Sequence, residues 1–547
     1  MSELELLFQA IIQNIKKRPS SVGLYVDAFG AAAEVAKTDT SLAVGLCREL
    51  MRYTRLELSQ ASSAASLEAL YSLYRTQLKF ASPHDFDSYL RFVEFELDPD
   101  KKFYLPRIDA LECVVKGVQA LADDHADLLC VSMPPGTGKS TMGEFALSWF
   151  CGREPDKPNL ASSYSGTITK KFYADVLTIM TDKRYLWGEV FSQNAVFSTD
   201  AKDLMINLNH HHPFATLTCR AINASLTGAT RCEGVLYADD LVSGIEEALS
   251  PERLDILWDK YVNDLKSRKK VGAKEFHIAT RWSVHDVIGR LGRDRKGDPR
   301  SIFITLPALN EAGNSNFDYP YGVGFDTAYF EDMKNTLDKV SWLSLYQNEP
   351  RERAGLLYSE GELMRYTELP AQPPDAVIAI YDTKDRGPDY AFMPVDYIYG
   401  DKHFIADCVC DNRLPEMIQP DVVAKMISHG IEMCRVESNA AGGTIADDVQ
   451  ASITERGGIT AITRKYSSVN KETRILANSP WVKRHCLFLS EECYKKGSQY
   501  ATMMEQMTSY TLDGRNPHDD VVDGLAMLAK YAQGMKDGIV EVFQRPF

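Results

Sequence analysis

The sequence has no long hydrophobic run and no bias toward any one kind of residue. Of its 547 residues, 44% are hydrophobic and 25% charged, with 24 prolines and 34 glycines. These proportions exclude a collagen-like, low-complexity or disordered chain. No apolar run approaches the ~20 residues of a membrane span, and the acidic start, Met1–Leu7, lacks the basic stretch of a secretory signal. We therefore expect a soluble, intracellular chain of two or three domains with no membrane partner.

The sequence also lacks the cysteine spacings of disulfide frameworks and zinc sites. Its 11 cysteines are scattered, and the nearest approach, Cys408-Val-Cys410, suits the alternation of a strand. The run His210–His212 lies beside Pro213 and is interpreted as a polar turn rather than a metal site. Reduced, structural cysteines are therefore predicted.

The sequence has fewer basic than acidic residues, 61 against 76, which gives a formal net charge of −15. This excess of acids argues against a protein that coats nucleic acid with its whole surface. Two local basic runs, 266–270 and 289–296, fit either a nucleic-acid track or an ordinary solvated face. Any nucleic-acid contact is thus expected to be local.

The hydrophobic pattern changes along the chain and predicts its organisation. Apolar residues recur at helical spacing up to about residue 95, after which short apolar runs alternate with helical stretches. Turn-forming residues then gather before a second series of strand-like runs. We predict an α/β chain with an α-helical N-terminal region (1–95), a parallel-sheet domain (96–350), a linker (351–374) and a second α/β domain (375–547).

A phosphate-binding loop is the clearest motif. An apolar strand, Leu128–Ser132, leads into Met133-Pro-Pro-Gly-Thr-Gly-Lys-Ser-Thr141, and a helical stretch follows. Met133 stands where the G-x-x-x-x-G-K-[ST] pattern has its first glycine, but the strand–loop–helix context is that of a P-loop. Backbone N–H groups and the lysine would hold ATP phosphates, and the Ser140 hydroxyl would help hold Mg²⁺. The predicted nucleotide-binding residues here are Pro135, Gly136, Thr137, Gly138, Lys139, Ser140 and Thr141.

Two further apolar runs end in polar residues that complete such a site. The run Gly234–Ala238 ends in Asp239 and Asp240. We predict that Asp239 serves the metal and that Asp240 polarises the attacking water, with Glu246 and Glu247 as weaker alternatives. The run Glu275–Ala279 ends in Thr280, which is placed to sense the γ-phosphate.

Four acids after residue 375 predict a second site. Asp382 and Glu437 each end a strand-like run, and Asp520 and Asp523 are spaced to share one helix face. A cluster of this kind repels itself unless cations neutralise it, and two Mg²⁺ ions (Mn²⁺ as an alternative) suit phosphodiester hydrolysis. We predict metal ligation by all four and catalytic roles for Asp382, Glu437 and Asp520, on a ribonuclease H-like fold. Asp389 and Asp519 are possible auxiliaries.

Taken together, these segments resemble the large terminase subunit of tailed bacteriophages, a DNA-packaging ATPase and nuclease. The resemblance runs from about Phe80 to Tyr531 and is specific only as a set. Besides the two sites, the family-like segments are Phe103–Arg107, Ala161–Ser165, Leu226–Thr230, Thr280–Trp282 with Asp286, Leu345–Pro350, Val436–Gly442, Lys471–Arg474 and His518–Leu525. The resemblance places Arg107 near the adenine.

The resemblance implies more than the residues themselves do. It implies a homo-oligomeric ring, expected as a pentamer, that docks on the portal protein of a procapsid in the host cytoplasm, while a small terminase subunit selects the double-stranded DNA. It also implies an arginine that acts on a neighbouring subunit's ATP, for which Arg184, Arg231 and Arg281 are open candidates.

Two other functions fit part of the pattern. A cellular repair or restriction enzyme could also join an ATPase to a nuclease. A non-catalytic scaffold with a degenerate nucleotide site is the third interpretation, and the complete set of acids at both sites argues against it.

Overall fold

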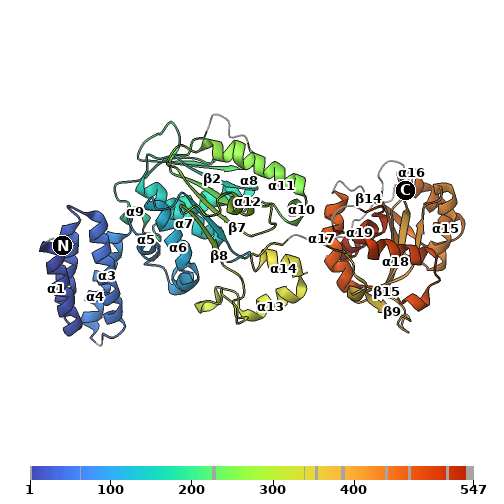
Figure 1. Cartoon of the computed structure of the whole chain (residues 1–547), viewed down its shortest axis with the longest axis horizontal. Coiled ribbons are helices and arrows are strands. Elements are labelled where there is room, and N and C mark those ends of the chain that lie inside the picture. The colour runs from blue at the N-terminus through green and yellow to red at the C-terminus, as the bar shows by residue number, and fades with distance from the viewer. Residues whose placement is uncertain are drawn as a thin grey trace. The chain divides into compact units, whose positions relative to one another are not determined.

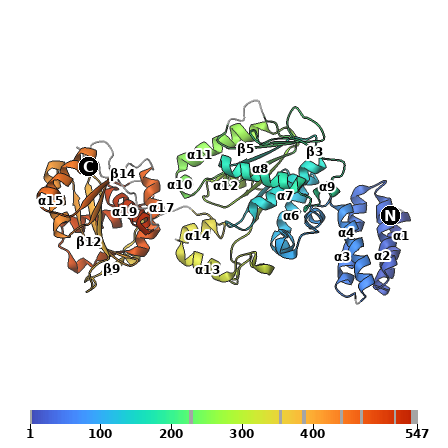
Figure 2. The ribbon, with the colours of Figure 1, turned by 180° about the vertical axis from the view of Figure 1, so that it is seen from behind.

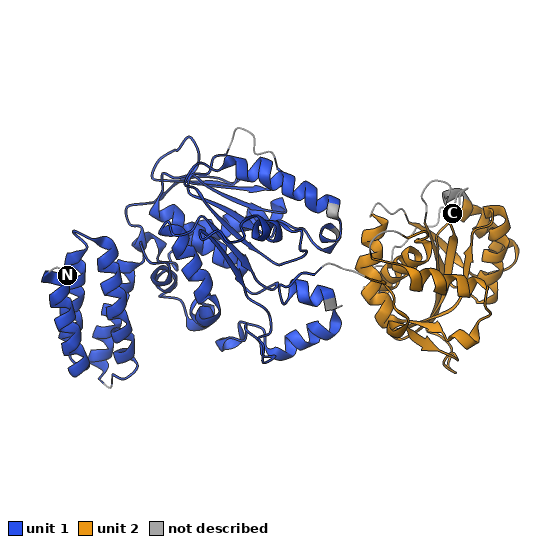
Figure 3. Ribbon diagram, viewed as in Figure 1, with its two compact units in different colours: residues 1–351 blue, residues 352–547 orange. Residues whose placement is uncertain are grey.

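The chain was analysed as a computed structural model, which describes residues 3–61, 63–224, 230–337, 339–351, 355–383, 389–437, 442–465, 470–512 and 516–536. It divides into two compact units, Met1–Arg351 and Glu352–Phe547 (Figure 3). The units are described separately below. No described helix is both long and apolar enough to cross a membrane.

The first unit begins with four helices that lie side by side (Figures 1 and 2). They are α1 (Glu3–Lys17), α2 (Val22–Val35), α3 (Thr40–Leu58) and α4 (Ala64–Ala81), and a short fifth helix, α5 (Phe86–Val93), follows. Each of the first four buries one apolar stripe, represented by Phe8, Tyr25, Leu50 and Leu70, in a shared core. The predicted helical N-terminal region is therefore present.

An eight-stranded, largely parallel sheet forms the rest of the first unit, in the order β3-β4-β5-β2-β6-β7-β1-β8. Its strands are β1 (Leu128–Ser132), β2 (Asn159–Ser163), β3 (Val196–Asp200), β4 (Met205–Leu208), β5 (Leu217–Ala221), β6 (Val235–Asp239), β7 (Lys274–Ala279) and β8 (Ser301–Thr305). The described antiparallel pairs are β3 with β4 and β4 with β5, and the other neighbours pair in parallel. Strand β7 therefore separates β1, which leads into the phosphate loop, from β6, which ends in Asp239.

Helices cover both faces of this sheet. They are α6 (Ile108–Ala122), α7 (Lys139–Arg153), α8 (Gly166–Thr181), α9 (Trp187–Val190), α10 (Ile245–Ala248), α11 (Pro251–Lys260), α12 (Val287–Asp294), α13 (Thr327–Thr336) and α14 (Lys339–Leu345). Alternate residues of β1 enter different cores: Leu129 and Val131 pack with α6 and α7, whereas Leu128 and Cys130 pack with α11 and α12. Burial on both faces explains why the strand is apolar throughout.

The second unit has a seven-stranded mixed sheet in the order β14-β13-β10-β11-β12-β15-β9. The strands are β9 (Met364–Tyr366), β10 (Ala376–Tyr381), β11 (Ala391–Tyr399), β12 (Lys402–Asp411), β13 (Met433–Glu437), β14 (Ala461–Lys465) and β15 (Cys486–Leu489). Strands β10, β11 and β12 form an antiparallel meander, and β13 and β14 add in parallel beside β10. This arrangement confirms the predicted ribonuclease H-like α/β fold.

Five helices accompany the second sheet: α15 (Pro415–Ser428), α16 (Gly442–Glu455), α17 (Lys471–His485), α18 (Gln499–Ser509) and α19 (Asp520–Lys536). Helix α19 packs on β10 and β11 and carries Asp520 and Asp523 in its first turn. The range 351–374, expected to be a linker, contains β9, which pairs in parallel with β15. Long-range strand pairing of this kind has no signal in the local turn-rich composition.

Candidate functional site

The predicted phosphate loop lies between the end of β1 and the start of α7. Gly136 and Gly138 have φ angles of 75° and 98°, a backbone region that strongly favours glycine. A Cβ on Gly138 would lie 2.7 Å from a ring carbon of Phe103, and one on Gly136 would lie 3.0 Å from Phe325. The two glycines therefore allow aromatic side chains to approach the loop closely. The backbone N–H groups of this loop lie at the N-terminus of α7, and such N–H groups commonly bind anions.

Lys139 is buried and is held by oxygen atoms alone. Its Nζ donates to the carbonyl oxygen of Pro134 at 2.9 Å and to the hydroxyl of Thr280 at 2.8 Å, and it lies 3.8 Å from a carboxylate oxygen of Asp240. Burial lowers the pKa of this ammonium, and the acids Asp240 and Asp239 oppose that shift. Thr280 follows β7 and lies between the phosphate loop and the two acids. Lys139 therefore contacts the loop at Pro134, the threonine and Asp240.

The two acids after β6 have different environments. Asp239 is 3% exposed, and no described residue makes a hydrogen bond of normal geometry to either carboxylate oxygen. Burial, together with the charge of Asp240, raises the pKa of Asp239 to about 7, and the Ser140 hydroxyl counters part of this rise. Asp240 has a φ of 39° and accepts a hydrogen bond of 2.7 Å from the Thr280 N–H. A buried carboxylate that has no hydrogen bond of normal geometry from the described residues, next to a P-loop serine, fits a divalent cation.

The segment ahead of the phosphate loop lies against it, and its expected place near the adenine stays a prediction. Phe103 stacks on Phe145 of α7, and the Arg107 guanidinium lies over the Phe103 ring at 5.0 Å. Arg107 donates to the carbonyl oxygens of Phe103 and Val323, while its buried Nε has no hydrogen-bond partner among the described residues. The segment around Val323 and Phe325 was not predicted from sequence, because nothing in its composition signals that it folds back onto the loop.

The candidate arginines differ in how they are held. Arg281 is pinned by both carboxylate oxygens of Asp286, at 3.1 and 2.9 Å. Arg231 pairs with Glu233 near the start of β6, and Arg184 is 74% exposed and paired with Asp182. Of the three, Arg184 is the most accessible to another molecule.

The alternative acids and the two basic runs of the first unit have ordinary local partners where they are described. The Glu247 carboxylate accepts hydrogen bonds from the backbone and hydroxyl of Ser243, as a local turn acid would. The side chain of Glu246 and residues 226–229 of the family-like segment lie outside the described residues. In the basic runs, Lys269 pairs with Glu275 and Arg290 with Asp255, so these cations have acidic partners.

In the second unit, strand register brings two of the predicted acids together. Strands β10 and β13 are parallel neighbours, with Tyr381 beside Val436. Asp382 and Glu437 are the next residues along, so their backbones meet at the carboxyl ends of adjacent strands. Asp382 is also tied to β11 by a pair of backbone hydrogen bonds with Phe392. The two acids therefore start from rigid positions.

The acids on α19 are held by basic residues of α17. Arg474 donates to both oxygens of Asp523 at 2.6 Å and lies 3.5 Å from Glu437. Lys471 lies 2.6 Å from Asp519 and 3.1 Å from Asp520, whose other oxygen accepts from the Tyr390 N–H. Two cations in the first turn of a helix oppose the helix dipole, and this unfavourable placement is a sequence signal that they face acids.

The electrostatics centre on Asp382. Burial raises the pKa of its carboxyl well above the usual value, and the charges of Glu437, Asp523 and Asp520 add to the rise. No described side chain donates a hydrogen bond to it. Among the described residues, no three of these acids bring one oxygen each within 4.8 Å of one another. The acids thus line the site instead of closing on one point, and their hard oxygen donors fit Mg²⁺ or Mn²⁺ beside Asp382 and Glu437.

The two possible auxiliary acids lie in different surroundings. Asp389 is exposed and Asp519 pairs with Lys471, whereas residues 438–441 of another family-like segment lie outside the described residues. His518 packs edge-on against Tyr390 at 5.0 Å. Lys471 and Arg474 were singled out in the sequence only as part of a family-like segment, without their role as partners of the acids.

Known proteins resemble this chain in fold and not detectably in sequence. No family model matches the sequence, and no curated protein matches it. Similar solved structures are large terminases. The large terminase of a thermophilic bacteriophage is 12% identical, and the match covers 79% of this chain and 99% of that one, with a TM-score of 0.47.

Two further similar structures are nuclease domains that cover smaller shares of the chain. The nuclease domain of the large terminase subunit of bacterial virus Sf6 is 10% identical, covers 29% of this chain and 89% of its own, and has a TM-score of 0.22. The human cytomegalovirus terminase nuclease domain, soaked with manganese, is 15% identical, covers 32% and 94%, and has a TM-score of 0.26. The likeness is one of fold, and it does not assign chemistry to the residues of this chain.

Proposed function

We propose that this chain is a viral DNA-packaging motor, in which the first unit hydrolyses ATP to translocate duplex DNA into a procapsid and the second cuts concatemeric DNA. The observation that carries the proposal is the presence in one chain of two separate acid sites. One surrounds Lys139 at a phosphate loop, and the other joins Asp382 and Glu437 on a ribonuclease H-like sheet.

In the first unit, the described contacts suit phosphate transfer to water. The loop N–H groups and Lys139 would bind the phosphates, since the two oxygens closest to this ammonium, the Pro134 carbonyl and the Thr280 hydroxyl, are neutral and could be replaced by phosphate oxygens. Ser140 and Asp239 would hold Mg²⁺, which supplies charge neutralisation at the phosphates. Asp240, fixed by the Thr280 N–H, would orient the attacking water. Thr280 links the lysine to this acid and is placed to register loss of the γ-phosphate.

In the second unit, the acids suit cleavage of a phosphodiester. Asp382, Glu437, Asp520 and Asp523 would bind divalent cations, whose chemistry there is activation of water and stabilisation of the leaving oxygen. Arg474 and Lys471 position the acids of α19 and limit the repulsion among them. Burial is the main cause of the raised pKa of Asp382, and the charges of Glu437, Asp523 and Asp520 add to it, so a cation there would relieve repulsion among these acids.

The partners follow from the same proposal. They are double-stranded DNA, a portal protein, a small terminase subunit and further copies of this chain in a ring, expected as a pentamer, on a procapsid in the host cytoplasm. The net charge of −15 supports a grip confined to part of the surface. Arg184 is the best-exposed of the arginines that could reach a neighbour's nucleotide.

A paired assay tests the proposal. Plasmid cleavage with Mg²⁺ or Mn²⁺ and ATP hydrolysis are measured for the wild type, Asp382→Ala and Lys139→Ala. We expect Asp382→Ala to lose cleavage and keep hydrolysis, and Lys139→Ala to do the reverse. Normal cleavage by Asp382→Ala would remove the nuclease assignment. Stimulation of ATP hydrolysis by procapsids that carry portal would favour packaging over a cellular repair or restriction enzyme, and its absence would favour the latter.

A further inference from the structure

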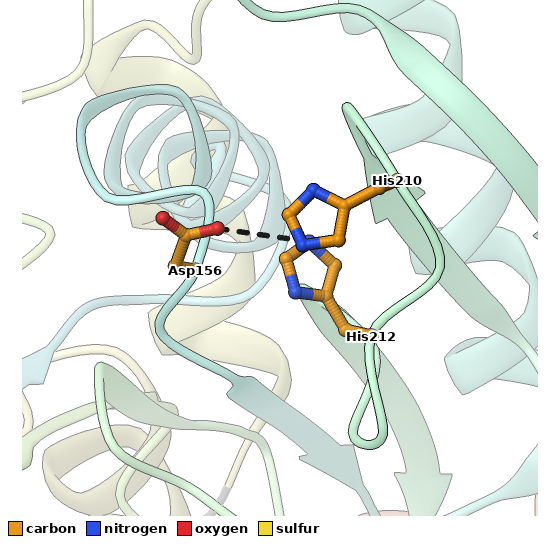
Figure 4. A group of neighbouring side chains, drawn as sticks. All are labelled: Asp156, His210 and His212. Carbon is orange, nitrogen blue, oxygen red and sulfur yellow. Dashed lines mark ion pairs between the residues drawn. The ribbon is translucent and has the colours of Figure 1, made fainter.

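Asp156, His210 and His212 form a cluster of potential metal ligands in the first unit (Figure 4), and none of them belongs to the predicted nucleotide site. One ligand atom from each residue lies within 4.8 Å of the other two, and His212 Nε2 lies 4.0 Å from an Asp156 oxygen. The rings of His210 and His212 are 4.0 Å apart between centroids. The sequence alone favoured a polar turn for 210–212, because Asp156 comes from a distant segment.

The two segments that supply these residues are fixed to each other by hydrogen bonds. Asp156 precedes β2, and the histidines lie between β4 and β5. The Thr216 hydroxyl donates to the Pro155 carbonyl oxygen at 2.9 Å, and its oxygen accepts from the Leu208 N–H at 3.2 Å. Thr216 therefore ties Pro155, the residue before Asp156, to Leu208, which lies just ahead of the histidines.

His212 is largely buried in the cluster. It is 8% exposed, and its Nε2 lies 3.0 Å from the Leu208 carbonyl oxygen and 4.0 Å from Asp156. Nε2 is thus the nitrogen on the Asp156 side, and a cation would be bound by Nε2 of the tautomer that carries its proton on Nδ1, in place of the contact with the Leu208 carbonyl. Asp156 and His210 are exposed and free to rotate, so they can close the remaining distance.

We propose that Asp156, His210 and His212 bind a Zn²⁺-type divalent cation. Two imidazoles and one carboxylate suit Zn²⁺ and poorly suit Mg²⁺ or Ca²⁺, which prefer oxygen ligands. Tetrahedral Zn²⁺ with bonds of ~2.0–2.1 Å separates its ligand atoms by about 3.4 Å, so modest side-chain rotation completes the site. A fourth position remains for water.

The cation would act as a clip remote from ATP. Strands β2, β5 and β6 run parallel to β1, so the cluster lies at the edge where strands begin, whereas Lys139 and Asp239 lie where strands end. Each of these four strands is five residues long, or ~17 Å, and this length separates the cluster's edge of the sheet from the edge with the nucleotide site. Binding therefore ties the turn before β2 to the loop before β5 without entering the nucleotide site.

The matched control for this proposal is His211, which lies in the same loop and is not part of the cluster. The full chain, without a histidine tag, is stripped with a chelator and dialysed against Zn²⁺ in excess Mg²⁺. We expect one tightly bound Zn²⁺ per chain in the wild type and in His211→Ala. His210→Ala and Asp156→Asn, both at exposed positions, should each lower the affinity at least about tenfold. Unchanged affinity in these two variants, or an equal loss in His211→Ala, would overturn the proposal.

Two further measurements keep the test independent of folding and of ATP chemistry. Co²⁺ in place of Zn²⁺ should give the strong visible absorption of a four-coordinate site in the wild type, and only weak six-coordinate bands would contradict the site. ATP hydrolysis should be equal in the wild type and His210→Ala, with or without Zn²⁺. A Zn²⁺-dependent difference would show that the ion acts on the nucleotide site, against the clip proposed here.

Discussion

The Nζ of Lys139 donates a 2.8 Å hydrogen bond to the hydroxyl of Thr280, across two strands that are neighbours in the sheet. The same threonine donates its backbone N–H to Asp240. One residue at the end of β7 thus contacts both the cation of the phosphate loop and the acid proposed to orient water.

Replacing the Thr280 hydroxyl tests this link. Thr280→Val removes the side-chain acceptor and keeps the backbone N–H to Asp240. A hydrogen bond to a charged group contributes about 1.5–3 kcal/mol, so we expect kcat for ATP hydrolysis to fall roughly 10- to 100-fold. Thr280→Ser, which restores the hydroxyl, should recover most of the rate in steady-state assays. A Thr280→Val enzyme with wild-type kcat would refute the link.

Gly138 is expected to be indispensable for nucleotide binding. An alanine there would be strained at a φ of 98° and would meet the Phe103 ring at 2.7 Å. We expect Gly138→Ala to weaken ATP binding by at least about tenfold, as measured with a fluorescent nucleotide analogue. Gly297→Ala is the control, because Gly297 has a φ of 82° with open space around it. Equal losses in both variants would mean that general strain, and not the loop, explains the effect.

Removal of Arg474 should destabilise the second unit in a cation-dependent way. Arg474→Ala leaves the buried Asp523 without its bidentate partner, and breaking a buried ion pair typically costs about 3–5 kcal/mol. We expect a lower Tm in chelator and partial recovery in Mn²⁺, which can take over the neutralisation. Arg464→Ala, at an exposed ion pair with Asp447, should change Tm little under both conditions. A loss unaffected by Mn²⁺ would contradict cation binding beside these acids.

Glu144 should make the first unit less stable at alkaline pH. Burial raises the pKa of this carboxyl to about 8, and the adjacent Asp175 adds to the rise. A carboxyl with a raised folded-state pKa binds more protons folded than unfolded, so stability falls as pH increases from about 4.5 to 8. Glu144→Gln removes this dependence.

The expected result for Glu144→Gln is a Tm above that of the wild type at pH 8.5, with the difference shrinking toward pH 5. The gain is on the order of 1 kcal/mol or more, since each pKa unit corresponds to about 1.4 kcal/mol. Thermal unfolding across this pH range, without nucleotide, measures it. A constant difference at every pH would point to packing instead of ionisation.

Local sequence determined the parts of this protein that lie within single elements. Strands buried on both faces are apolar throughout, and the residues that end them, such as Asp239, Thr280 and Asp382, stand out as polar residues after apolar runs. The phosphate loop is also recognisable locally, because its glycines have positive φ angles that few other residues adopt. The α/β class and the identity of the two acid sets could therefore be predicted.

Strand order and the contacts between distant segments were decided only by the tertiary structure. Sequence does not state that β7 separates β1 from β6, so the Lys139–Thr280 bond could not be predicted from it. Nor does it state that Arg474 of α17 holds Asp523 of α19, or that Asp156 meets His210. Pairings of this kind depend on long-range packing of many side chains at once, whereas the patterns read from sequence reflect each residue's immediate neighbours along the chain.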